Sequence, residues 1–108
     1  MIKIDIKPLS VNQAWMGRKF KTKLYKDYEI ELTLKLPKLK IDSESKLELN
    51  IIVGYSNKGS DIDNFLKPFI DILQKKYLFN DKNIYSLNII KEIVSKGNEF
   101  IEFEIKEI

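Results

Sequence analysis

The sequence contains no cysteine and no histidine, and these two absences exclude many common catalytic chemistries. Without cysteine there is no disulfide, no thiol nucleophile and no zinc finger. Without histidine there is no imidazole to act as general base, proton shuttle or metal ligand. No apolar run reaches the roughly 18 residues of a membrane-spanning helix, and the first residues have no signal-peptide core. We therefore expect a soluble, cytoplasmic protein whose chemistry uses carboxylates, lysine, hydroxyls, amides or a hard cation bound by oxygen.

Glycine is also scarce, with four residues in the chain. None of them belongs to the Gly-x-x-x-x-Gly-Lys loop that binds nucleotide phosphates. An EF-hand loop beginning at Asp61 would need glycine at position 66 and glutamate at position 72, where the chain has leucine and isoleucine. The composition is that of a small folded unit, since 44% of the 108 residues are hydrophobic and 32% are charged. We expect a single domain over residues 1–108.

The charges are unevenly distributed along the chain, although the net charge is only +3. Residues 1–40 carry ten basic and four acidic side chains, whereas the rest of the chain carries nine basic and twelve acidic ones. This asymmetry is typical of a surface that faces a polyanion beside a cluster of carboxylates. A solvated, lysine-rich surface gives the same counts, and charge alone favours that plainer interpretation.

Alternating apolar residues predict four strands. They cover residues 2–7, 46–55, 83–94 and 99–106. The segment 9–21 shows no regular period, and a polar loop over residues 56–60 leads into an acidic run. The sequence therefore divides into strands with two longer segments between them that have to be assigned.

Those two segments favour helices. Residues 22–36 fit both a helix and a strand, and we favour a helix capped by Thr22 that ends before Pro37. Residues 63–76 present a wide apolar helix face, in which Pro68 is tolerated because the first N–H groups of a helix have no partner. About four strands and two helices predict an α+β fold with one mixed sheet.

Acidic residues gather where the second helix is expected to begin. Asp61 and Asp63 follow a predicted strand, and Asp63, Lys67 and Asp71 recur every four residues on one stripe of the helix. Asp81 lies just before the next predicted strand. Each residue has a plain structural explanation as a helix cap, a turn residue or a surface ion pair. The functional interpretation is a site for Mg²⁺ or Mn²⁺, with a lysine beside it to stabilise charge on a reacting phosphate.

A second pattern lies near the N-terminus. Arg18, Lys19, Lys21 and Lys23 are interleaved with an aromatic residue, and Trp15 comes just before them. Basic and aromatic side chains in this arrangement suit phosphate contact and base stacking. An ordinary exposed loop explains the segment equally well.

The run over residues 60–73, together with the later Asp81, resembles the RusA family of Holliday-junction resolvases. The family pattern is Asp-x-Asp-Asn-hydrophobic-hydrophobic-Lys, followed by a helix and a further aspartate. Residues 8–15 are similar to the Pro-x-Ser-x-Asn opening of the family, with Asn12 as its asparagine. The resemblance covers nearly the whole chain, and its central motif is the specific part.

This resemblance implies a dimeric, Mg²⁺-dependent endonuclease that cuts four-way DNA junctions in recombination and repair, often encoded by prophages. Asp61, Asp63 and Asp81 match the catalytic acidic positions and would hold the metal. Lys67 matches the catalytic lysine, and Asp71 matches a position that is commonly acidic. The residues that would bind DNA are Asn12, Trp15, Arg18, Lys19, Lys21 and Lys23.

Chain length limits how Asp81 can meet the other aspartates. A helix from Asp63 to Lys76 is about 20 Å long at about 1.5 Å per residue, and the loop from Tyr77 to Asp81 spans at most about 17 Å. Asp81 can reach Asp61 only if this loop returns nearly straight or if the helix ends early. Otherwise it meets the aspartates of a second subunit. We therefore expect a site close to a two-fold axis, where dimerisation and metal binding are coupled.

Other functions stay open at this point. A non-catalytic nucleic-acid-binding module would bind in a salt-dependent way and would not cut. A nuclease for other branched DNA would share the same residues. A phosphatase built on the Asp-x-Asp pair usually has an aspartate directly at a strand end, whereas a polar loop intervenes in this sequence.

Overall fold

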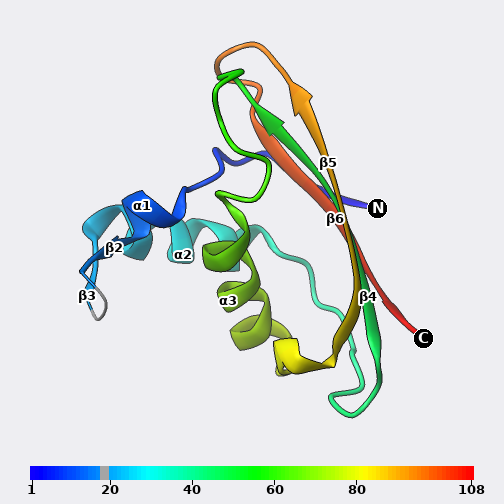
Figure 1. The fold of residues 1–108 in the computed structure, drawn as a ribbon. Helices are drawn as coiled ribbons and strands as arrows, with labels where there is room; N and C mark the ends of the chain where they lie inside the picture. Colours follow the sequence, from blue (N-terminus) through cyan, green and yellow to red (C-terminus); the bar gives the residue numbers. More distant parts are fainter. Residues whose placement is uncertain (18–19) are drawn as a thin grey trace.

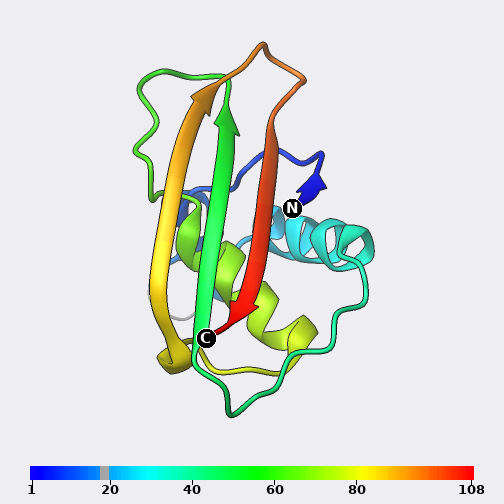
Figure 2. The same ribbon diagram turned by 90° about the vertical axis from the view of Figure 1, so that its right-hand side faces the viewer.

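The computed structural model of the chain describes residues 1–17 and 20–108. Within these residues, four strands form one sheet and two long helices cover one of its faces (Figure 1, Figure 2). The strands are β1 (Ile2–Ile4), β4 (Leu47–Tyr55), β5 (Ile84–Ile93) and β6 (Phe100–Glu107). The helices are α2 (Lys23–Lys35) and α3 (Leu66–Tyr77). The predicted α+β fold with a four-stranded mixed sheet is confirmed.

The sheet has the strand order β1-β6-β4-β5. β6 runs antiparallel to β1 and β4, whereas β4 and β5 are parallel. Parallel neighbours need a crossover connection, and α3 is the helix of that crossover. Every second side chain of β4 is buried beneath the helices, including Leu49, Ile51 and Val53. The alternation read from the sequence therefore marks the face that α3 covers.

The two helices follow the capping signals in the sequence. The Thr22 hydroxyl accepts a hydrogen bond from the Tyr25 N–H at 3.2 Å, and α2 ends at Lys35, before Pro37. α3 buries an apolar face against the sheet, where the Phe69 ring meets Phe103 edge-on with the centroids 5.5 Å apart. The predicted helices at 22–36 and 63–76 are thus present.

Two boundaries differ from the prediction by three residues, whereas several others differ by one. α3 begins at Leu66 rather than near Asp63, because the carbonyls of Asp61 and Asp63 accept hydrogen bonds from the N–H groups of Asn64 and Leu66 in a preceding turn. β1 ends at Ile4 rather than at residue 7, since its partner strand β6 begins close to the residue that pairs with Ile4.

The segment predicted to be irregular contains short elements. They are α1 (Val11–Ala14) and a hairpin of β2 (Trp15–Met16) and β3 (Phe20–Lys21). Ser10 starts α1 with a capping box, in which the Ser10 hydroxyl accepts from the Gln13 N–H and the Gln13 side chain accepts from the Ser10 N–H. Such short elements contain too few residues to show a period in the sequence.

The opposite face of the sheet carries no helix in the part of the chain that the structure describes (Figure 1). Its side chains form a polar network. The Asn50 amide donates to Glu48 and Glu104 at 3.1 Å each, and the Asn88 amide donates to Asn50 at 2.7 Å. Among the described residues, no helix is both long and apolar enough to cross a membrane.

Gly54 and Phe100 form a close pair on β4 and β6. The two residues are aligned in the sheet, and the Phe100 ring lies against the Gly54 backbone. A Cβ atom on Gly54 would overlap that ring. Glycine is needed at position 54 because the Phe100 ring lies so close to its backbone. Its backbone conformation is not the reason, because its φ is not positive.

We expect Gly54→Ala to lower the free energy of unfolding by about 1–3 kcal/mol, because the added methyl group displaces a buried ring. Chemical denaturation measures this loss. Gly59→Ala is the matched control, since its Cβ would meet only the flexible side chain of Asn57 at 3.3 Å. Equal stability of the two variants would contradict the close pair.

Candidate active site

A shallow hollow of about 330 Å³ follows the exposed side of α3, and we call it the acidic hollow. Its polar lining consists of Asp63, Lys67, Asp71 and Asp81. Lys67 and Asp71 lie one helical turn apart, with the Lys67 ammonium 3.6 Å from the Asp71 carboxylate. The structure therefore brings two of the three predicted metal ligands, the predicted catalytic lysine and Asp71 to one place.

Asp81 reaches this hollow because α3 ends with a reversal of the chain. Leu78 adopts a left-handed conformation with φ 57°, and the short helix η1 (Asp81–Asn83) follows. The Asp81 N–H then donates to the Gln74 side chain at 2.8 Å, which ties Asp81 to α3. Asp81 and Asp63 thus line the same hollow. Whether Asp81 also serves the site of a second subunit stays a prediction.

Asp61 lies outside the acidic hollow. Within residues 1–17 and 20–108, no three acidic side chains lie close enough together to hold a metal ion. A site formed jointly by Asp61, Asp63 and Asp81 therefore stays a prediction.

Helix capping does not explain the Asp61 and Asp63 pair. The N-cap of α3 is Phe65, and no side chain caps that end of the helix. Both aspartates are exposed, as is Asp81. Their carboxylate oxygens are the hard donors that Mg²⁺ and Mn²⁺ prefer, so the residues present suit such an ion.

Lys91 of β5 fixes the loop that leads into the acidic pair. Its ammonium donates to the backbone carbonyls of Lys58 and Ser60. It also lies 6.0 Å from the centroid of the Tyr55 ring, at the end of β4. Lys91 thus holds the backbone of residues 58–60 in place, immediately before Asp61.

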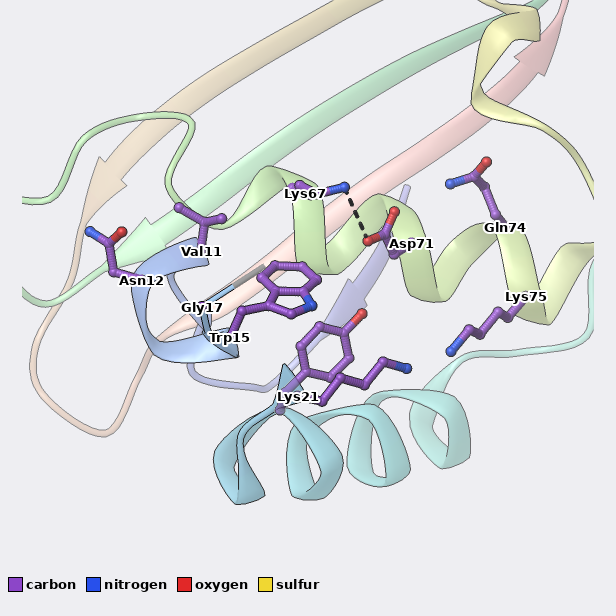
Figure 3. A pocket seen from close by; sticks show the side chains of 10 residues that line it. Val11, Asn12, Trp15, Gly17, Lys21, Lys67, Asp71, Gln74 and Lys75 are labelled. Atoms are coloured by element: carbon purple, nitrogen blue, oxygen red, sulfur yellow. Dashed lines mark ion pairs between the residues drawn. The ribbon is translucent and has the colours of Figure 1, made fainter. Parts of the chain in front are cut away.

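A larger hollow of about 780 Å³ lies on the other side of Lys67 and Asp71, and we call it the basic hollow (Figure 3). It lies between α1 and the β2–β3 hairpin on one side and α3 on the other (Figure 3). Three predicted DNA-binding residues, Asn12, Trp15 and Lys21, line it. The structure therefore brings these residues next to the acidic hollow.

The remaining predicted DNA-binding residues are not part of the basic hollow. Lys23 lies on the exposed side of α2, where its ammonium pairs with Asp27 at 3.2 Å. Arg18 and Lys19 lie outside the described residues. Their predicted contact with DNA stays a prediction.

The hairpin is what brings Trp15 and Lys21 together. The two residues are paired across β2 and β3, so both side chains project from the same face. The Thr22 N–H donates to the Ala14 carbonyl at 3.0 Å, which joins the hairpin to α1. Gly17 provides the left-handed turn conformation with φ 65°.

Glu29 of α2 holds two lysines at the edge of the basic hollow. Its carboxylate lies 2.7 Å from the Lys75 ammonium and 3.6 Å from that of Lys21. Burial alone would raise the pKa of Glu29, but the hydrogen bond from Lys75 and the charge of Lys21 together lower it. The hydrogen bond to Glu29 raises the pKa of Lys75, so this ammonium stays charged at neutral pH.

Tyr25, Gln74 and Lys75 line the basic hollow and were not singled out from the sequence. Lys75 continues the four-residue spacing of Lys67 and Asp71 by one step, so a longer reading of that stripe would have found it. Tyr25 has the helical spacing of a core residue, and although it matches the family pattern after Lys21 and Thr22, the resemblance gives it no role. Burial, with the nearby charges of Asp71 and Glu29, raises the pKa of Tyr25 to about 12, so its hydroxyl stays protonated.

We expect Lys91→Met to loosen the loop over residues 56–60, because two hydrogen bonds from a charged donor are lost. Hydrogen exchange of the loop amides should be at least about fivefold faster, which corresponds to about 1 kcal/mol. Lys96→Met, in the exposed β5–β6 turn, removes the same charge and should leave the loop unchanged. Unchanged exchange in the Lys91 variant would show that other contacts fix the loop.

The family model of endodeoxyribonuclease RusA matches residues 9–106 of this chain. A comparison with curated proteins gives no match. The matched residues include every described residue that lines the two hollows. The resemblance read from the sequence is confirmed, and the chain belongs to the endodeoxyribonuclease RusA family.

Proposed function

We propose that this protein is a Mg²⁺-dependent endonuclease that resolves Holliday junctions in recombination and repair by paired hydrolysis of phosphodiester bonds. The proposal rests on one observation, which is that the acidic hollow and the basic hollow share lining residues. Lys67 and Asp71 line both, so a carboxylate site and a cationic surface meet at one wall. A nuclease needs this combination, since it must attract a polyanion and also hold a divalent cation against it.

Asp61, Asp63 and Asp81 are the residues that would hold the cation. When bound, a divalent cation polarises a phosphoryl oxygen and lowers the pKa of water. Mn²⁺ is a suitable substitute, because it accepts the same oxygen ligands.

Lys67 would stabilise negative charge on the phosphate that is cut. Its side chain is 65% exposed and its ion pair with Asp71, at 3.6 Å, lies at the surface, so the ammonium can turn to a phosphate at little cost. Lys21 and Lys75 extend the cationic surface away from the acidic hollow. Both hollows are lined by residues of α3, so the substrate would approach from the side of the helices.

We expect Asp63→Asn to reduce Mg²⁺-dependent cleavage of a synthetic four-way junction by about 100-fold or more, because a ligand of the cation is lost. Junction binding should be unchanged or tighter, since one negative charge near the phosphates is removed. Cleavage gels and binding titrations measure the two effects.

The control for this variant is Asp5→Asn, which changes the charge equally at an exposed position outside both hollows. It should cut like the wild type. A chelator should abolish cutting by the wild type. Wild-type cleavage by the Asp63 variant would refute the assignment, and salt-dependent binding without any cutting would identify a binding module instead.

We also propose that the protein acts as a homodimer that pairs through the edge strand β5. Leu87 and Ile93 are aligned with the buried Leu49 and Tyr55 of β4, yet they are 42% and 46% exposed. The outer edge of β5 has no partner strand in the described sheet. A long, apolar, unpaired edge is a template for association, and a second copy of the chain would cover it.

We expect Ile93→Glu to convert the dimer into a 12.7 kDa monomer, because a charge would be buried in the interface. Light scattering after size-exclusion chromatography measures the mass. Ile30→Glu, at a site on α2 that is 61% exposed, is the control and should stay dimeric. A wild-type protein of monomer mass would rule out the β5 interface.

A subunit-mixing experiment tests whether Asp63 and Asp81 act within one chain, as their shared hollow supports. Dimers that combine an Asp63→Asn subunit with an Asp81→Asn subunit then contain no intact site, and cleavage should stay lost. Mixing wild type with the double variant controls for subunit exchange. Recovered cleavage would mean that Asp81 serves the site of its partner.

A further inference from the structure

We propose that the basic hollow binds one unstacked nucleobase of the strand that is cut, with the indole ring of Trp15 as its stacking surface. This inference rests on the proposed nuclease function, and it names a subsite that the function by itself does not require.

The position of the hollow suits the nucleotide next to the cut. Lys67 and Asp71 form the wall shared with the acidic hollow, and Gln74 lines the basic hollow while its side chain holds the Asp81 N–H. A strand whose phosphate lies at Lys67 therefore places the adjoining nucleotide at the mouth of the basic hollow. Its volume of about 780 Å³ is within the range of about 300–1,000 Å³ that is typical of ligand pockets.

Trp15 provides the surface on which a base can stack. Its ring is half-buried and projects into the hollow (Figure 3), and the edge-on contact with Tyr25, with centroids 5.0 Å apart, fixes its orientation. Stacking of bases on aromatic side chains is favourable for every base, because every base has a π face. A fixed ring loses little conformational entropy on binding.

The polar groups around Trp15 complete a nucleotide site. The Asn12 amide offers both a donor and an acceptor to a base edge. Lys21 and Lys75 offer two ammonium groups for the neighbouring phosphates, and Glu29 holds both in place from the side. An aromatic ring, an amide and paired cations around one hollow match a nucleotide better than an apolar ligand.

The free protein keeps Lys67 over the Trp15 ring, with the ammonium 5.5 Å from the ring centroid. A base that stacks on the Trp15 ring replaces this contact, and the Lys67 ammonium is then free to turn toward the phosphate. Unstacking a base costs least where stacking is already interrupted, as at a branch point. The hollow therefore favours branched DNA over a continuous duplex.

Trp15 is the single tryptophan of the chain, so its fluorescence reports on the hollow directly. The wild-type protein is titrated with a four-way junction in buffer without divalent cations, which prevents cutting. A series of junctions then carries one abasic nucleotide at each position around the cut. We expect quenching on binding, and a single position whose abasic form removes the quenching and weakens affinity about 5- to 150-fold.

Variants separate stacking from shape. Trp15→Phe keeps an aromatic face and should retain most of the affinity, whereas Trp15→Leu should lose about 5- to 150-fold. Phe20→Leu is the matched control, because Phe20 is 69% exposed on the other face of the same hairpin. Circular dichroism checks that each variant is folded, and the abasic series on the wild type does not depend on any variant.

Three results would overturn the inference. One is quenching that no abasic position changes, and another is a junction that is bound and cut with no change in Trp15 fluorescence. The third is quenching by free deoxynucleoside monophosphates at the concentrations at which DNA saturates it, which would identify a mononucleotide site. In the first two cases Mg²⁺-dependent cleavage would leave the proposed nuclease function standing, whereas a protein that neither binds nor cuts junctions would overturn both.

Discussion

The attachment of α3 to the sheet determines every other feature of the site. Phe69 and Leu73 are fully buried, and the Phe69 ring meets Phe103 edge-on. Each such side chain stabilises the fold by about 1.5–3 kcal/mol, so the helix cannot rotate about its axis without a large loss. The opposite row of the helix, with Lys67 and Asp71, is therefore held outward as the wall between the two hollows.

The same topology explains why the acidic residues do not converge fully. β4 and β5 are parallel, so the end of one and the start of the other lie at opposite ends of the sheet. Asp63 lies in the loop that follows β4 and Asp81 lies just before β5, with the length of α3 between them. The reversal at Leu78 and the bond to Gln74 shorten this gap. Asp61, one step further back, remains outside the acidic hollow.

Much of this architecture was readable from the sequence, because β4, β5 and β6 alternate cleanly and α2 and α3 have caps or a wide apolar face. The stripe of Lys67 and Asp71 was readable for the same reason, since helical spacing fixes which side chains share a face. The basic hollow was not, because its walls come from a short hairpin and two helices far apart in sequence. No local pattern shows that Trp15 and Lys75 line the same hollow.

The two hollows would act in opposite ways on a DNA backbone, because the acidic hollow repels phosphates and the basic hollow attracts them. Exposed carboxylates repel a phosphate, and a cation removes that repulsion only when it is bound. The ammonium groups of Lys21 and Lys75 attract the backbone whether or not a cation is bound, and their ion pairs with Glu29 hold them at the edge of the basic hollow. Under the proposed function, affinity therefore resides in the basic hollow and does not require the metal. The acidic hollow would then add its chemistry to a complex that has already formed, so we expect binding and cutting to be separable properties of two adjacent surfaces.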